Sequence, residues 1–201
     1  MRNAIVLMAV SGIASAAAAQ TATLNIVASQ SVVSPFVTNM ITLSVYGSAD
    51  FGTHIAGGGF SISANGGAGG IGATVGTVAP WGAIGLNDLG DGGDGNYNGL
   101  VFGQLIFPPL FPPAPESDFT GGEVLLATFS VEILPGFSFI EWSTALAPVG
   151  GGVVLQIYDA GDGSLTDVTV ANFGSAQIFI PAPSSVALLG LGGLVAGRRR
   201  R

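Results

Sequence analysis

The chain has 201 residues, enough for one ordinary domain, and 48% of them are hydrophobic, enough for a buried core. Only 8% are charged, where soluble domains average about 25%, and the absence of Cys excludes disulfides and thiolate chemistry. All 12 acidic residues lie between Gln20 and Gly197, a stretch that holds no Lys or Arg. Such a stretch repels phosphate backbones, which argues against a nucleic-acid partner.

The first residues have the order of a secretory signal peptide. Arg2 makes a short basic start, and residues 5–13 form an apolar run that is too short to span a bilayer. The expected cleavage motif consists of Ala17 and Ala19, followed by Gln20. An amphipathic helix is the alternative, but the run has no polar face. We expect signal peptidase to remove residues 1–19 and the mature chain to lie outside the cytoplasm.

The body, residues 20–180, alternates apolar and polar side chains with the period of half-buried strands. The pattern predicts strands within residues 21–28, 40–47, 99–107, 123–133, 138–145, 151–158, 167–173 and 176–180. Its predicted inward residues include Ile41, Leu43 and Val45 in one strand, and Leu125, Ala127, Phe129, Val131 and Ile133 in another. Glycine clusters, among them residues 57–59, predict breaks between strands. Eight or nine such strands predict an all-β fold, an antiparallel β-sandwich or jelly roll.

An acidic, glycine-rich loop is predicted at residues 87–99, NDLGDGGDGNYNG. Its aspartates recur every three residues, and carboxylate and amide oxygens are the ligands that Ca²⁺ prefers. The candidate ligands are Asp88, Asp91, Asp94, Asn96 and Asn98. A second stretch offers Asp159, Asp162 and Asp167. Neither stretch has the spacing of an EF-hand, and a solvated cluster of Asp-Gly turns is the alternative to calcium.

A proline-rich segment, FPPLFPPAPE, holds five of the 11 prolines. It is predicted to be extended and to cross between strands or sheets. Phe111 either forms an exposed contact point or folds back onto the core. The larger aromatic residues either form an exposed surface that stacks on sugars or belong to the core. These residues are Trp81, Trp142, Tyr97 and Tyr158.

Few residues suit catalysis. His54 is the single histidine, and neither a G-x-S-x-G motif nor the further ligands of a zinc site accompany it, so we expect a structural role with a satisfied hydrogen bond. Glu132 and Glu141 could form a glycosidase pair, but Glu132 falls on the polar face of its strand. The glycine clusters lack the lysine and the helix of a nucleotide site. The chain is therefore expected not to be an enzyme.

The last 21 residues carry three signals in order. Pro181, Ala182 and Pro183 break the preceding strand, residues 186–197 are apolar, and the basic end consists of Arg198, Arg199, Arg200 and Arg201. A cationic cluster after an apolar helix stays on the cytoplasmic side, which places the body outside. A helix over the apolar run would reach only about 18 Å, against about 30 Å of hydrocarbon core. It is therefore short for a permanent membrane anchor.

This order resembles the PEP-CTERM sorting signal over residues 181–201, with Ala182 where that signal usually has Glu. The resemblance implies an exosortase-type processing enzyme as partner, transit through the inner membrane, removal of the tail, and delivery to the cell surface or extracellular matrix. An ordinary C-terminal tail anchor is the alternative.

The strand pattern of residues 21–180, with its apolar strand LLATF, also resembles cohesin-like β-sandwiches. Cohesins bind a dockerin through one sheet face, but the match has no fixed motif that would assign this role to a residue. The sequence therefore predicts an exported, non-catalytic surface or matrix protein. The alternative is a cohesin-like module that binds a dockerin-like protein or a polysaccharide and is stabilised by Ca²⁺. A glycan hydrolase is the third hypothesis.

Overall fold

The computed structural model describes residues 21–65, 70–84, 86–135, 139–145 and 155–181. In these ranges the chain forms β-strands and two short 3-10 turns, Pro80–Gly82 and Pro115–Ser117. No helix in the described part of the chain is long and apolar enough to cross a bilayer. The expected signal peptide, residues 1–19, and the expected tail after Pro181 lie outside the described residues.

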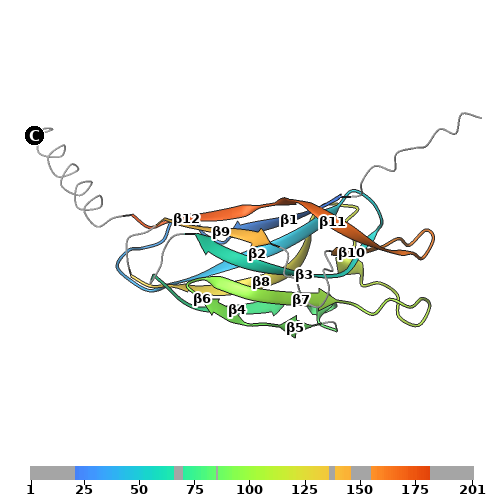
Figure 1. Cartoon of the computed structure of the whole chain (residues 1–201), viewed down its shortest axis with the longest axis horizontal. Helices are drawn as coiled ribbons and strands as arrows, with labels where there is room; N and C mark the ends of the chain where they lie inside the picture. Colours follow the sequence, from blue (N-terminus) through green and yellow to red (C-terminus); the bar gives the residue numbers. More distant parts are fainter. Residues whose placement is uncertain (1–20, 66–69, 85, 136–138, 146–154, 182–201) are drawn as a thin grey trace, which may run out of the picture.

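The strands form two layers that face each other (Figure 1). The first layer has the order β4 (Ile71–Val78), β8 (Val124–Ile133), β2 (Asn39–Ala49) and β1 (Thr21–Ala28). The second layer is centred on β3 (His54–Asn65), which pairs with β7 (Asn96–Gly103) on one edge and with β9 (Phe139–Ala145) and β10 (Leu155–Tyr158) on the other. The remaining pairs add β12 (Ser175–Phe179) to β9, and β5 (Asn87–Asp88) and β6 (Asp91–Gly93) to β7. The predicted all-β sandwich is confirmed.

Strand β11 (Leu165–Phe173) joins the two layers. Its residues 165–168 pair antiparallel with β10, and its residues 169–173 pair parallel with the start of β1. The same strand is thus antiparallel to β10 in one layer and parallel to β1 in the other. The prediction of a purely antiparallel sandwich is therefore wrong at the β1–β11 pair.

Alternation predicts the buried face of β2 correctly and that of β8 from Ala127 to Ile133, but it fails at the start of β8. The inward side chains of β2 are Ile41, Leu43 and Val45, as expected. In β8, Leu126 is fully buried and Leu125 only half-buried, the reverse of the prediction. The cause is a β-bulge: consecutive residues Val45 and Tyr46 pair with Ala127 and Leu125, which leaves Leu126 as an extra residue.

Residues 57–59, the glycines that predict a break, lie inside β3 and are buried. A Cβ atom on Gly57 would lie 2.9 Å from the carbonyl oxygen of Phe102 and 3.1 Å from Cα of Gly103. A side chain there would push β7 away from β3. The glycines therefore permit a close approach of two paired strands, and the prediction of a break is wrong.

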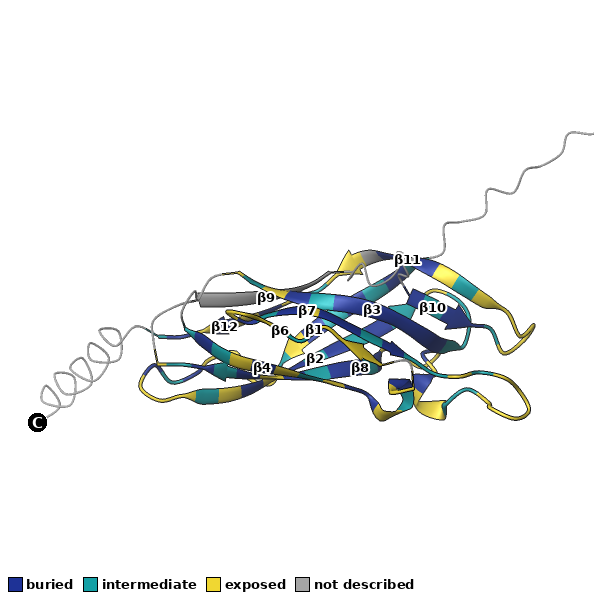
Figure 2. Cartoon of the chain, turned by 60° about the horizontal axis from the view of Figure 1, so that its bottom comes forward, coloured by how far each residue is buried: buried dark blue, intermediate teal, exposed yellow. Residues whose placement is uncertain are grey.

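The core lies between the layers, and the residues that face it are buried (Figure 2). Its centre is a chain of tilted and edge-to-face ring contacts. Phe60 of β3 meets Phe129 of β8 with ring centroids 6.1 Å apart, and Tyr97 meets Phe129 at 5.0 Å. Phe102 connects Phe60 to Trp81 through centroid distances of 6.0 and 5.7 Å. These ring contacts pack the two layers against each other in the centre of the core.

Candidate functional site

The loop after β7, residues 105–112, carries a concentrated exposed apolar surface, and we call it the tongue. Phe107 and Phe111 face each other as a backbone pair, in which the N–H of each donates to the carbonyl of the other, at 2.7 and 2.9 Å. Leu110, at the turn between them, is 71% exposed. The side chains of the tongue that are at least half exposed are Leu105, Phe107, Leu110 and Phe111. Contiguous exposed apolar side chains are a common feature of interaction surfaces, which makes the tongue a candidate site.

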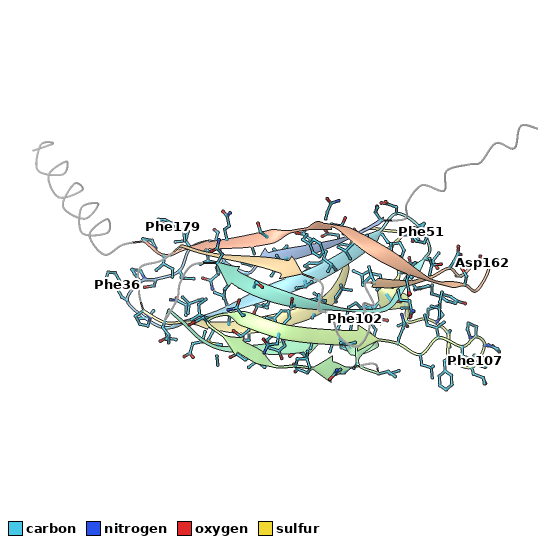
Figure 3. All side chains as sticks on the ribbon, in the orientation of Figure 1. Phe36, Phe51, Phe102, Phe107, Asp162 and Phe179 are labelled. Atoms are coloured by element: carbon cyan, nitrogen blue, oxygen red, sulfur yellow. The ribbon has the colours of Figure 1, made fainter. Side chains whose placement is uncertain are left out.

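The tongue differs from the sequence expectation in two respects. The proline-rich segment reverses direction between Phe107 and Phe111 and is not extended across the sheets. Phe111 does not fold back onto the core, because half of its surface is exposed. The tongue, marked by Phe107 in Figure 3, projects beyond the strands at one end of the molecule, and Phe179 lies at the opposite end.

A polar network holds the base of the tongue. The Gln104 side-chain amide donates to the carbonyl of Ile55 and to Oγ of Ser117, both at 2.8 Å, and its oxygen accepts from the N–H of Ala114 at 2.7 Å. Buried Ser117 donates its own proton to the carbonyl of Ala114 at 2.6 Å, so Nδ1 of His54, 3.0 Å away, is the donor to Ser117 Oγ. The predicted hydrogen bond of His54 is confirmed.

Carboxylates surround this base. Glu116 and Asp118 flank Ser117 in the chain and are exposed. The backbone N–H of Thr120, and next its hydroxyl, donate to Asp118 and hold the pKa of that carboxyl below its usual value. The hydroxyl of Ser164, and next its backbone N–H, lower the pKa of Asp162, which lies on a turn at the same end of the molecule (Figure 3). The tongue is thus an apolar projection with exposed carboxylates beside it.

The candidate calcium ligands lie on a flap made of β5, β6 and the start of β7. Asp88 Oδ1 accepts from the N–H of Gly90 at 2.8 Å and from the hydroxyl of Tyr97 at 2.7 Å. This pair of bonds closes the turn after β5 and connects the flap to a core tyrosine.

Asp91 and Asn96 hold the same flap against the sandwich. Asp91 accepts from the N–H of Gly93 at 2.9 Å and, through its other oxygen, from the N–H of Thr74 in β4 at 3.1 Å. Asn96 Oδ1 accepts from the N–H of Ala64 in β3 at 3.0 Å. These side chains therefore connect the flap to both layers.

No three carboxylate or imidazole side chains within the described ranges are placed to hold a metal ion. The structure thus does not bring Asp88, Asp91 and Asp94 together as a group, and Asp88 and Asp91 accept hydrogen bonds from the protein. In the second stretch, Asp159 and Asp162 close a turn by accepting from the N–H groups of Gly161 and Ser164. Calcium binding by Asp88, Asp91, Asp94, Asn96 and Asn98 stays a prediction.

Tyr97 gives the flap a measurable dependence on pH. Burial, and next the hydrogen bond to Asp88, raise the pKa of Tyr97 to about 12. The unfolded chain loses this proton near pH 10, so its contribution to stability is complete below pH 10 and is lost as the pH rises through about 12. We expect the free energy of unfolding to fall between pH 10 and 12. In Tyr97→Phe the free energy of unfolding, measured with urea, should fall less over this pH range. An equal fall in both proteins would show that Tyr97 is not the group responsible.

The sugar-stacking hypothesis is wrong for three of its four aromatic residues. Tyr97 and Tyr158 are buried, and the Trp81 indole donates to the carbonyl of Leu125 at 3.2 Å while its ring packs on Phe102. The side chains of Trp142 and Glu141 lie outside the described residues. The glycosidase pair of Glu132 and Glu141 therefore stays an untested hypothesis.

The sequence alone points to Phe111 and misses the rest of the tongue and its base. One feature of the sequence could have predicted the exposure of Leu105, Phe107 and Leu110, namely their position beside prolines. Proline has no N–H for a ladder, so apolar side chains beside it are less readily buried in a sheet. Gln104 and Ser117 carry no such signal, because their partners are distant in the chain.

The chain matches no protein-family profile and no curated protein. Among solved structures it is similar to the seventh ScaB type I cohesin of Pseudobacteroides cellulosolvens, with 9% identity, 80% of this chain and 95% of that chain covered, and a TM-score of 0.49. It is also similar to the sixth scaffoldin B cohesin of Acetivibrio cellulolyticus, solved with a dockerin, with 10% identity, 79% and 99% covered, and a TM-score of 0.46. A third similar structure is the cohesin CaCohA2 of Clostridium acetobutylicum, with 16% identity, 81% of this chain and 94% of that chain covered, and a TM-score of 0.44.

Proposed function

We propose that this chain is an exported, non-catalytic binding module that holds a partner protein through its tongue. The observation that carries the proposal is the tongue itself, an exposed apolar hairpin tip fixed by two backbone hydrogen bonds and by the Gln104 network at its base. A surface that is ordered before binding loses little entropy on binding. Apolar side chains held in this way are suited to filling a pocket in a partner.

The chemistry of the partner follows from the charges beside the tongue. Glu116 and Asp118 flank Ser117 at the base of the tongue, and Asp162 lies at the same end of the molecule (Figure 3). Residues 3–197 contain no Lys or Arg. An anionic membrane surface or a nucleic acid would be repelled. A protein with an apolar pocket and a rim of Lys or Arg is complementary in both respects. Because of the sequence resemblance to cohesins, a dockerin-like protein is the first partner class to test.

Export and sorting form the second part of the proposal and are supported by the sequence of the two ends. Signal peptidase would cleave before Gln20, and an exosortase-type enzyme would process the tail that begins with Pro181, Ala182 and Pro183. The chain enters this tail at the Phe179 end, opposite the tongue (Figure 3). A membrane-held or surface-held tail would therefore present the tongue outward.

The intact mass of the exported protein tests this second part. We expect a species that begins at Gln20 and lacks Arg198–Arg201. A species that begins at Met1, or one that ends at Arg201, would contradict cleavage at the corresponding end.

Photo-cross-linking tests the tongue. A benzoylphenylalanine at Leu110 of the full chain, on the producing cells, is expected to attach to one protein. The matched control carries the same group at Val75, which is 60% exposed on β4. The Leu110 adduct should disappear in the Phe107→Ser/Phe111→Ser background. No adduct at Leu110, or the same adduct at both positions, would overturn the proposal.

A further inference from the structure

A second surface lies at a distance from the tongue, between β1 and β12. The chain closes this space at two places: the N–H of Gly174, just before β12, donates to the carbonyl of Leu24 in β1 at 2.7 Å, and the N–H of Phe179 donates to the carbonyl of Ser31, just after β1, at 2.8 Å. Between these closures no strand pairing among the described residues joins β1 and β12. A shallow groove of about 340 Å³, largely open to solvent, lies there.

The lining of the groove is polar and uncharged. Its polar side chains are two hydroxyls and three carboxamides, from Asn25, Gln30, Ser31, Ser175 and Gln177. Buried Ile26 and Ala176, with Val27 and Ala28, supply the apolar part. Carboxamides and hydroxyls both donate and accept hydrogen bonds, which complements a ligand rich in hydroxyl groups. A charged ligand would find no opposite charge in the lining.

One of the carboxamides is held in place. Asn25 donates from Nδ2 to Glu123 Oε1 at 3.2 Å, so its orientation is fixed by a neighbour outside the groove. Its Oδ1 lies over Gly174, where an added Cβ would approach it to 2.4 Å. Gly174 therefore leaves the space that the Asn25 amide occupies, and this amide is positioned before any ligand arrives.

Exposed aromatic rings stand at both ends of the β12 segment that lines the groove. Phe173 precedes Gly174 and is 43% exposed, and Phe179 ends the strand and is 54% exposed. The negative face of an aromatic ring attracts the C–H face of a sugar ring, and each ring also buries apolar area on contact. Along the chain the two rings therefore flank the β12 residues of the groove, Ser175, Ala176 and Gln177, and lie just outside its lining.

We propose that this groove binds a neutral polysaccharide chain, with the amides and hydroxyls bonding sugar hydroxyls and with Phe173 and Phe179 stacking on sugar rings. The site is independent of the tongue, since Phe179 and Phe107 lie at opposite ends of the molecule (Figure 3). It adds a second ligand class to the protein partner of the proposed function.

Affinity electrophoresis of the full chain tests the groove, with native gels that contain a soluble β-glucan, xylan or α-glucan and, for comparison, anionic polygalacturonate. We expect retardation by at least one neutral polymer and none by polygalacturonate. Gln30→Ala and Phe179→Ala should each weaken that binding roughly tenfold, as expected for well-placed contacts in a binding site. Both side chains are exposed, so the melting temperature should stay unchanged.

The matched control is Phe36→Ala, which removes a similarly exposed ring that belongs neither to the groove lining nor to the segment from Phe173 to Phe179, and it should leave retardation unchanged. Phe107→Ser/Phe111→Ser should also retain it, which separates this proposal from the one for the tongue. Absence of retardation by all three neutral polymers, equal retardation by polygalacturonate, or full binding by both groove variants would overturn the proposal.

Discussion

Gln104→Ala is expected to lower the free energy of unfolding by about 2–4 kcal/mol, since it removes three hydrogen bonds worth roughly 1 kcal/mol each and leaves partly buried groups unpaired. The lost bonds are those to the carbonyl of Ile55, to Ser117 Oγ and from the N–H of Ala114. Because they join the two sides of the tongue's base to β3, the variant should also lose binding of the tongue's partner.

Gln156→Ala is the matched control. Its amide also bonds a side chain, Asp167 at 3.0 Å, but on the exposed face of β10. We expect a change below about 0.5 kcal/mol there, as for other surface positions. Urea unfolding of both variants measures the difference, and equal losses would mean that the network does not hold the tongue.

Phe129→Ala is expected to have the largest effect on the sandwich, about 3–5 kcal/mol, as for other buried aromatic residues replaced by alanine. Phe129 is fully buried and meets Phe60 of the opposite layer and Tyr97 of β7. The cavity would lie where the layers are joined. Phe36→Ala, on the surface, should change the free energy of unfolding by less than about 0.5 kcal/mol. A loss for Phe129→Ala as small as that control would contradict the assigned core.

The sequence pattern predicts the sandwich because alternation records burial directly. It gives the buried face of β2 correctly, since this strand alternates regularly between buried and more exposed residues. It fails at Leu126, because a bulge changes the count by one residue, and at Gly57, because a glycine that allows close strand approach looks like one that ends a strand. The parallel pairing of β1 with β11 depends on how distant strands meet, which local periodicity does not encode.

The candidate surfaces are harder to predict for the same reason. The tongue depends on Gln104 reaching Ile55 and Ser117 across the fold, and the groove depends on β1 and β12 separating between Gly174 and Phe179. The aspartates of residues 87–99 have the composition of a calcium loop, yet Asp88 and Asp91 accept hydrogen bonds from Tyr97 and Thr74. Composition indicates which oxygen atoms are present, and the fold decides which partners they meet.

Calorimetry with the partner protein identified by cross-linking at Leu110 tests the role of the tongue most directly. It compares the affinity of this partner for the unaltered chain with its affinity for the Phe107→Ser/Phe111→Ser variant. We expect the dissociation constant to rise at least about 100-fold relative to the unaltered chain, because the complex loses two aromatic side chains that the partner's pocket would bury. The melting temperature should not fall, since both rings are exposed in the free protein. An unchanged dissociation constant would contradict the account.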